Sequence, residues 1–168
     1  DSEYKSGYGG IVNMNGEGTV FNLYDGVITG GSSWARTVKT PGSGGNVYAA
    51  SNAVFNMYGG TVKDGKVYGN GIVETSTDEE GKPVYKAAAA YGGNFYLSTG
   101  AKFNIYGGTV SGGEAVRESF DYVQVDGKDA SIKNTAYGGN FYLSSTSGEL
   151  YVGKATITGG VAYCGGNI

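Results

Sequence analysis

The sequence predicts an all-β protein, a right-handed parallel β-helix of about four coils with hairpin inserts at one corner. Two observations lead to this prediction. The heptapeptide Gly-Gly-Asn-Phe-Tyr-Leu-Ser occurs at 92–98 and again at 138–144, and shorter versions of it begin at Gly9, Gly44 and Gly165. Within the repeated units the apolar residues alternate with other residues, which is the period of a β-strand and not of a helix.

Four units of 22 or 23 residues follow from these repeats, at 9–31, 44–65, 92–113 and 138–160, after a lead of eight residues. Each unit begins with Gly-Gly, passes through a Phe-Asn-x-Tyr segment or a variant of it, and closes on a Thr-Val-like step with glycine. Three short strands separated by glycine corners describe one turn of a parallel β-helix. An antiparallel sandwich also has short strands and regular turns, but it does not require like residues at matching positions.

Alignment of the units produces five apolar columns, which we expect to face one shared interior. The columns are Val12/Val47/Phe95/Phe141, Met14/Ala49/Leu97/Leu143, Phe21/Phe55/Phe103/Leu150, Leu23/Met57/Ile105/Val152 and Ile28/Val62/Val110/Ile157. Neighbouring coils would pair about 4.8 Å apart, so that like residues stack on one another. The hexapeptide pattern of left-handed helices and the glycine nonapeptide of calcium β-rolls are both missing, which favours the right-handed form.

Asparagine and tyrosine recur in columns as well. The asparagines are Asn46, Asn94, Asn140 and Asn167, and the tyrosine columns are Tyr8/Tyr91/Tyr137, Tyr48/Tyr96/Tyr142 and Tyr24/Tyr58/Tyr106. Stacked asparagines form amide ladders that satisfy backbone groups at a corner, and a row that reads a ligand is the alternative. Tyrosine rows either stabilise adjacent coils by stacking or present aromatic surface to a sugar or a protein.

Variable inserts separate the units at 32–43, 66–91, 114–137 and 161–164. They contain 17 of the 27 charged residues, both prolines, both arginines and the only tryptophan. Insertions at one corner of a repeat protein project from the same side and lie next to one another.

Two of the inserts predict β-hairpins that stand side by side. In the first, 72–74 and 85–86 are the arms and Gly81-Lys82 is the turn. In the second, 119–122 and 132–133 flank a Gly127-Lys128 turn.

Composition argues against several functions. The net charge is −3 with no basic run, which gives no support for a nucleic-acid partner, and no apolar run is long enough for membrane insertion. The chain has no histidine, and no acidic column runs through the units to hold calcium or to act as acid and base. We therefore predict no cofactor, no metal and no catalytic residue. The single cysteine, Cys164, cannot form an internal disulfide and is expected to be partly buried.

The unit sequences resemble a known class of repeat. Gly-Gly-Asn-(Val/Phe)-Tyr followed by Phe-Asn-(Met/Ile)-Tyr-Gly-Gly-Thr-Val is similar to the repeat units of large bacterial surface proteins with pectin-lyase-like right-handed β-helices. It is loosely similar to the repeats of autotransporter-type adhesins. Ile11 in the first unit and Tyr151 in the fourth depart from the pattern, at positions where the other units have asparagine. The resemblance implies a secreted or bacterial cell-surface location, but β-helices host lyases, hydrolases and adhesins alike.

The expected function is non-catalytic binding or adhesion, with the corner inserts recognising a host or environmental protein or glycan. The inserts carry residue types enriched at binding hot spots, namely Trp34, Arg36, Tyr68, Tyr85, Arg117, Phe120 and Tyr122. A fragment of a β-helical polysaccharide lyase or glycoside hydrolase is the alternative, and a purely structural stalk is a third. Because the last residues begin a fifth unit, we expect a longer repeat protein whose open strand edges favour end-to-end self-association.

Overall fold

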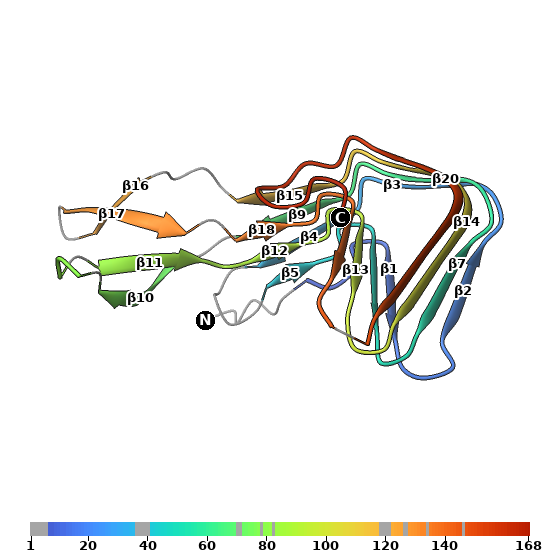
Figure 1. Ribbon diagram of the computed structural model, residues 1–168, viewed down its shortest axis with the longest axis horizontal. Coiled ribbons are helices and arrows are strands. Elements are labelled where there is room, and N and C mark those ends of the chain that lie inside the picture. The colour runs from blue at the N-terminus through green and yellow to red at the C-terminus, as the bar shows by residue number, and fades with distance from the viewer. Residues whose placement is uncertain are drawn as a thin grey trace.

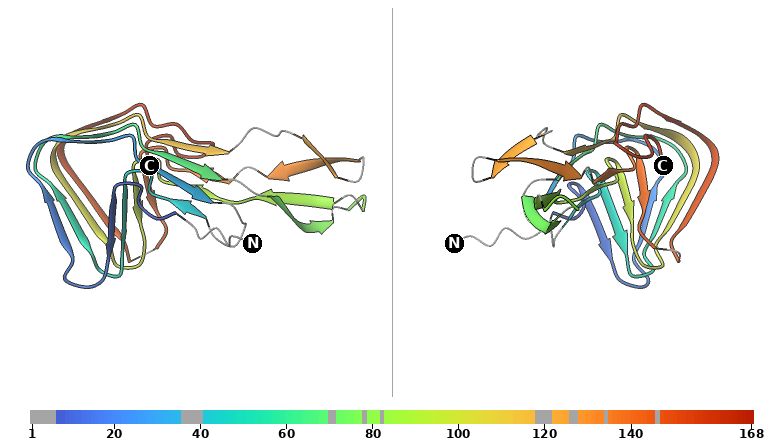
Figure 2. Two further views of the ribbon diagram at one scale, coloured as in Figure 1. Left: turned by 180° about the vertical axis from the view of Figure 1, so that it is seen from behind. Right: turned by 60° about the vertical axis from the view of Figure 1, so that its left-hand side comes forward.

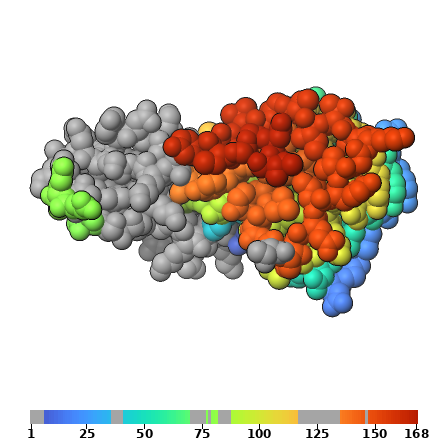
Figure 3. Space-filling view, viewed as in Figure 1, coloured from blue at the N-terminus to red at the C-terminus, as the bar shows by residue number. Residues whose placement is uncertain are grey.

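The computed structural model describes residues 7–35, 41–69, 72–77, 79–81, 83–117, 122–125, 128–133, 135–145 and 147–168. These residues form strands, bridges, turns and bends, with no helix among them (Figure 1). It follows that no helix able to span a membrane occurs in the described part of the chain. Each sequence unit forms one layer, and Figure 3 shows the last layer, in orange and red, lying over the earlier ones.

The first strands of the four units form one parallel sheet. They are β1 (Val12–Asn15), β6 (Val47–Ala50), β13 (Phe95–Leu97) and β19 (Phe141–Leu143), in the order β1-β6-β13-β19. Each strand pairs in parallel with its counterpart in the next unit, so that equivalent residues of neighbouring layers lie directly opposite one another.

The remaining strands of the units form a second parallel sheet. They are β2 (Val20–Leu23), β3 (Val27–Thr29), β7 (Val54–Met57), β8 (Thr61–Lys63), β14 (Lys102–Ser111) and β20 (Glu149–Thr158). The sequence predicts three separate strands in every unit. In the third and fourth units, however, the second and third strands merge into the single long strands β14 and β20, because their pairing continues through the glycine step at Gly107 and Gly108.

A continuous apolar core lies between these sheets. All five predicted columns are in register from layer to layer. Phe95 is fully buried, stacks on Phe141 at 4.8 Å and meets Phe55 and Phe103 edge to face. Val152 is in register with Ile105 but, unlike the other members of the five columns, it is exposed.

The pairing decides between the two folds that the sequence left open. Within the described ranges every pairing between units is parallel. The alternative of an antiparallel sandwich is therefore wrong.

Parallel stacking continues into the inserts. Their first residues form the sheet of β4 (Ser32–Ala35), β9 (Lys66–Gly69) and β15 (Glu114–Arg117), and their last residues form the sheet of β5 (Gly42–Ser43), β12 (Ala90–Tyr91) and β18 (Ala136–Tyr137). A second, smaller core of Val67, Ala90, Ala115 and Ala136 is formed by residues of both sheets. We call this double layer the arm.

Two hairpins extend the arm away from the main core (Figure 2). Strands β10 (Ile72–Thr77) and β11 (Pro83–Ala87) pair antiparallel, as do β16 (Tyr122–Val125) and β17 (Lys128–Lys133). Strand β11 also pairs in parallel with β17, which joins the hairpins into one four-stranded sheet. The predicted pair of hairpins side by side is confirmed for the described strands, whereas Lys82, Gly127 and 119–121 lie outside the described residues.

The buried phenylalanine cluster generates a stability prediction. Replacing Phe95 by alanine removes contacts with three other rings and leaves a cavity, so the free energy of unfolding should fall by about 3–5 kcal/mol. The exposed Val20, replaced by alanine, should change it by less than about 0.5 kcal/mol. Urea unfolding followed by circular dichroism measures both values, and equal losses would contradict the assignment of Phe95 to the core.

Candidate functional site

The Gly-Gly-Asn corner has a separate structural reason for each of its residues. Gly92 adopts a φ of 65°, in the left-handed region that glycine enters without strain. Gly93 lies so close to the end of its own unit and to the next layer that a Cβ there would overlap the Glu114 nitrogen and the Gly139 carbonyl oxygen. The corner therefore tolerates no side chain at Gly93, and the first side chain after it is that of Asn94.

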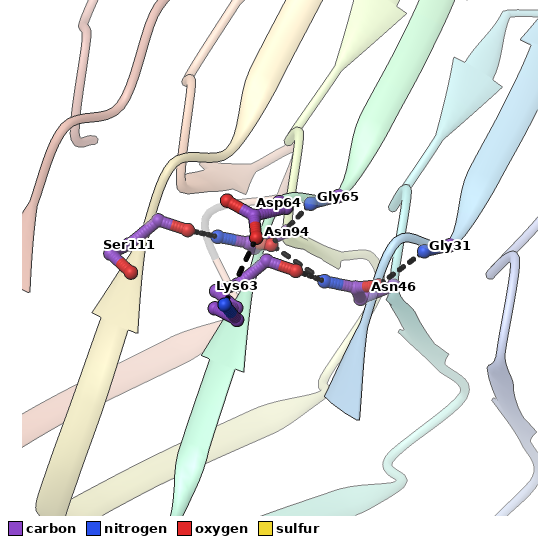
Figure 4. A network of polar contacts seen from close by, with 7 residues as sticks. All are labelled: Gly31, Asn46, Lys63, Asp64, Gly65, Asn94 and Ser111. Atoms are coloured by element: carbon purple, nitrogen blue, oxygen red, sulfur yellow. Dashed lines mark hydrogen bonds and ion pairs between the residues drawn. The ribbon is translucent and has the colours of Figure 1, made fainter. Parts of the chain in front are cut away.

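The asparagines form a buried amide ladder that links the layers (Figure 4). The Nδ2 atom of Asn46 donates to Oδ1 of Asn94 at 2.7 Å, and Nδ2 of Asn94 donates to Oδ1 of Asn140 at 2.7 Å. The Oδ1 atom of Asn94 also accepts from the Gly65 nitrogen, and its Nδ2 donates to the Ser111 carbonyl oxygen.

All of the hydrogen-bonding capacity of the Asn94 amide is used within the protein. The side chains of Asn46, Asn94 and Asn140 are fully buried. The interpretation of this column as a structural ladder is confirmed. None of these amides has a free group with which to read a ligand, so the alternative of a ligand-reading row is wrong for them.

Loss of a buried ladder asparagine should lower the free energy of unfolding more than loss of a partly exposed one. Asn94→Ala leaves the buried Gly65 nitrogen without an acceptor and should lower the free energy of unfolding by at least about 2 kcal/mol. The matched control is Asn104→Ala, in the partly exposed Asn22–Asn56–Asn104 ladder, which should cost about 1 kcal/mol or less. Chemical unfolding measures both free energies. A larger loss for Asn104→Ala than for Asn94→Ala would contradict the structural role of the buried ladder.

One tyrosine column runs along the outside of the main core, and we call it the outer tyrosine stripe. It consists of Tyr24, Tyr58, Tyr106 and Tyr151, all of them exposed. Ring centroids of the first three are 5.0 and 5.1 Å apart, with interplanar angles of 9° and 17°. In the fourth unit Tyr151 stands opposite Asn104, at the position that asparagine has in the Asn22–Asn56–Asn104 ladder. Its ring lies 5.6 Å from that of Tyr106 and so joins the stripe. Because the inner rings stack face to face, they offer their edges and hydroxyl groups to solvent.

The other two tyrosine columns meet at the Gly-Gly-Asn corner, and we call them the corner tyrosine cluster. Rings from β6, β13 and β19 stack on one another, with 5.3 Å between Tyr48 and Tyr96. Tyr91 of β12 lies 4.4 Å from Tyr142 of β19, so the cluster joins the arm to the main core. These four rings are half-buried.

Burial changes the acidity of the corner tyrosine cluster. Desolvation raises the pKa of Tyr91 above its ordinary value of 10.0, and the nearby phenols of Tyr142, Tyr137 and Tyr96 raise it further. The pKa values of Tyr48 and Tyr142 are raised by desolvation and by neighbouring tyrosines in the same way. These phenols therefore lose their protons at a higher pH in the folded chain than in the unfolded chain.

A pH dependence follows from these shifts. A raised pKa in the folded state gives stability that is fully present below pH 10 and is lost as the pH rises above it, because the unfolded phenols ionise first. The thermal midpoint should fall above about pH 10, and Tyr91→Phe should make that fall shallower. Tyr163→Phe, which removes an exposed phenol outside the cluster, should follow the parent curve. Identical slopes for Tyr91→Phe and the parent would refute the prediction.

The arm brings two of the predicted binding residues together. Trp34 of β4 stacks on Tyr68 of β9 with 4.0 Å between centroids and 18° between planes, and the tryptophan is 41% exposed. Beside them, Lys66 donates to the Glu114 carboxylate at 2.8 Å, and this hydrogen bond together with its charge attraction raises the pKa of Lys66. The pair of rings and the ion pair lie in the same sheet of the arm.

Three further predicted binding residues are placed by the pairing of their strands. Arg117 ends β15 opposite Gly69, Tyr85 lies in β11 opposite Glu74 and Ile132, and Tyr122 begins β16 opposite Ser131. The pairing places all three in the arm and its hairpins. Arg36 and Phe120 lie outside the described residues.

One sequence prediction, that for Cys164, is wrong, and two serines that the sequence did not single out are buried. The expectation that Cys164 is partly buried is wrong, because the cysteine lies in the last layer, where it is exposed and its backbone forms a bridge with that of Tyr137. Ser33 and Ser43, at the base of the first insert, are buried and their hydroxyl groups have no hydrogen-bond partner. No group of three potential metal-ligating side chains gathers within the described ranges.

Comparison with known proteins identifies no relative, since no family model, no curated protein and no solved structure matches this chain.

Proposed function

We propose that this chain is a segment of a right-handed parallel β-helix that acts as a non-catalytic binding or adhesion module. The in-register parallel stacking of four units supports the β-helix. A secreted or bacterial cell-surface location is part of the proposal and rests on the resemblance of the repeats. The partner is a host or environmental protein or glycan.

The stacked Trp34–Tyr68 pair on the arm is the observation that carries the binding proposal. Both rings lie outside the main core and outside the small core of the arm, so neither core explains them. The tryptophan is already held against the tyrosine, which lowers the side-chain entropy lost when a partner binds. Large aromatic side chains with neighbouring charges are typical of binding hot spots.

The position of the arm supports the same conclusion. Layer stacking constrains the main core column by column, whereas the hairpins of the arm pair mainly with one another. Sequence can therefore vary in the arm without disturbing the core, as it does in binding loops on rigid scaffolds.

Screening on glycan and protein arrays, followed by a variant, tests this function. Trp34→Ala should weaken binding to any array partner at least about tenfold, because it removes the largest exposed ring of the arm. Val20→Ala, which truncates an exposed apolar residue away from the arm, should bind like the parent.

Trimming the hairpins gives a second measurement. Short Gly-Asn links in place of 72–87 and 119–133 keep the strands β9, β12, β15 and β18 that stack at the base of the arm. If the trimmed chain and Trp34→Ala both bind unchanged, the arm is not the site. Release of unsaturated or reducing ends from a polysaccharide panel would instead support the carbohydrate-active enzyme.

A further inference from the structure

The outer tyrosine stripe has a geometry that sugar stacking does not explain. A sugar ring packs on an open aromatic face, but both faces of Tyr58 are covered, by Tyr24 on one side and Tyr106 on the other. The stripe also lies away from the arm, on the outside of the second sheet. Tyr24 and Tyr58 directly follow β2 and β7, and Tyr106 and Tyr151 lie in β14 and β20. Four exposed phenols in consecutive layers therefore call for another chemical role.

Exposure and spacing suit the stripe to oxidative coupling. In two nearly parallel rings, corresponding Cε carbons lie about as far apart as the centroids, which are separated by 5.0 and 5.1 Å. The rings are not enclosed on their outer side, so they can tilt towards each other. Tyr106 and Tyr151 already do so, with an angle of 50° between their planes.

The surroundings of the stripe hold no competing reductant among the described residues that contact it. Met57 is fully buried beneath the glycine step, and Trp34 stacks on Tyr68 in the arm. The backbone of Cys164 pairs with that of Tyr137, which places the cysteine next to the corner tyrosine cluster and not next to the stripe. A tyrosyl radical formed in the stripe thus has another stripe tyrosine as its nearest reactive neighbour.

We propose that the outer tyrosine stripe is an oxidative cross-linking site, at which hydrogen peroxide and a haem peroxidase join tyrosines of neighbouring layers into dityrosine. Each phenol loses one electron and one proton to the peroxidase, and the two radicals form a carbon–carbon bond between their Cε atoms. Two ring protons then leave as the rings become aromatic again and return to the phenolate oxygens or to solvent. Overall, two tyrosines lose two hydrogen atoms and one hydrogen peroxide becomes two waters.

The cross-link would do for this chain what a disulfide does elsewhere. The only cysteine is Cys164, so no disulfide can form within the chain. A bond between Tyr24 and Tyr58, or between Tyr58 and Tyr106, ties one layer covalently to the next and restricts the unfolded state. The cross-linked chain should therefore unfold at a higher temperature than the untreated chain.

Peptide mapping of the full chain after treatment with peroxidase and hydrogen peroxide tests the proposal. Trypsin places Tyr106 in peptide 103–117, which contains no other tyrosine, and Tyr58 in peptide 40–63. The expected result is dityrosine fluorescence in monomeric protein, with 103–117 joined to 40–63 through Tyr58 or to 134–154 through Tyr151. Fragment spectra distinguish Tyr58 from Tyr48 and Tyr151 from Tyr137 and Tyr142.

Two conservative variants separate the stripe from general tyrosine oxidation. Tyr58→Phe keeps a stacked ring but lacks the phenol, so the links of Tyr24 should disappear while the Tyr106–Tyr151 link remains. Tyr24→Phe should remove the Tyr24–Tyr58 link alone, without altering an inner ring. The matched control is Tyr163→Phe, because Tyr163 is 69% exposed, like Tyr24, and its ring stacks on no other ring of the described residues. That variant should cross-link like the parent.

Three results would overturn the proposal. The first is dityrosine that joins no two of the four stripe tyrosines. The second is cross-linking only between chains, seen as covalent dimers on a denaturing gel with no cross-linked monomer. The third is Tyr24 still linked in the Tyr58→Phe variant at the parent's yield. Each result would mean that the stacking of the stripe does not direct the coupling.

Discussion

The stacking of the layers depends on the Gly-Gly-Asn corner. Glycine at its second position lets one backbone pass against the next, and the asparagine then uses its whole amide to bond to both neighbouring layers and to the corner backbone. A buried amide with all its bonds made stabilises one register, because a shift between layers would leave the group unsatisfied. The five apolar columns, the tyrosine columns and the base of the arm all inherit this register.

Aromatic residues have different roles on the two sides of the molecule. In the corner tyrosine cluster the rings of Tyr91 and Tyr142 pack across the joint between the arm and the main core, where burial raises their pKa. In the outer tyrosine stripe the rings stack along the layers and stay exposed. The first arrangement holds two parts of the chain together, whereas the second leaves phenol groups open to chemistry from solvent.

The arm combines a rigid base with a variable end. Small residues such as Ala90 and Ala115 let its two sheets approach closely, and Gly69 has no room for a Cβ against the Ala88 carbonyl oxygen. The base therefore continues the layer register of the main core, and the hairpins beyond it pair with each other. A surface held in this way is preordered, which supports the proposed recognition through aromatic residues such as Trp34 and Tyr68.

The repeats were enough to predict the columns, the paired hairpins and most of the strands, because every unit repeats similar residues and in-register pairing sets like residues opposite one another. They did not predict that two strands merge in β14 and in β20. The sequence also identified Trp34 and Tyr68, but not their contact, because 32–35 and 66–69 share no identical residue, although they follow the closing Gly31 and Gly65 at equal distances. Three features became evident from the three-dimensional packing alone: the inserts stack in parallel at their bases, Tyr151 joins the outer tyrosine stripe, and Cys164 is exposed. The physical reason is that these features depend on how residues from different strands and layers pack in space. A repeat pattern shows which residues of the units are equivalent, but it does not show which of their side chains stay exposed after folding.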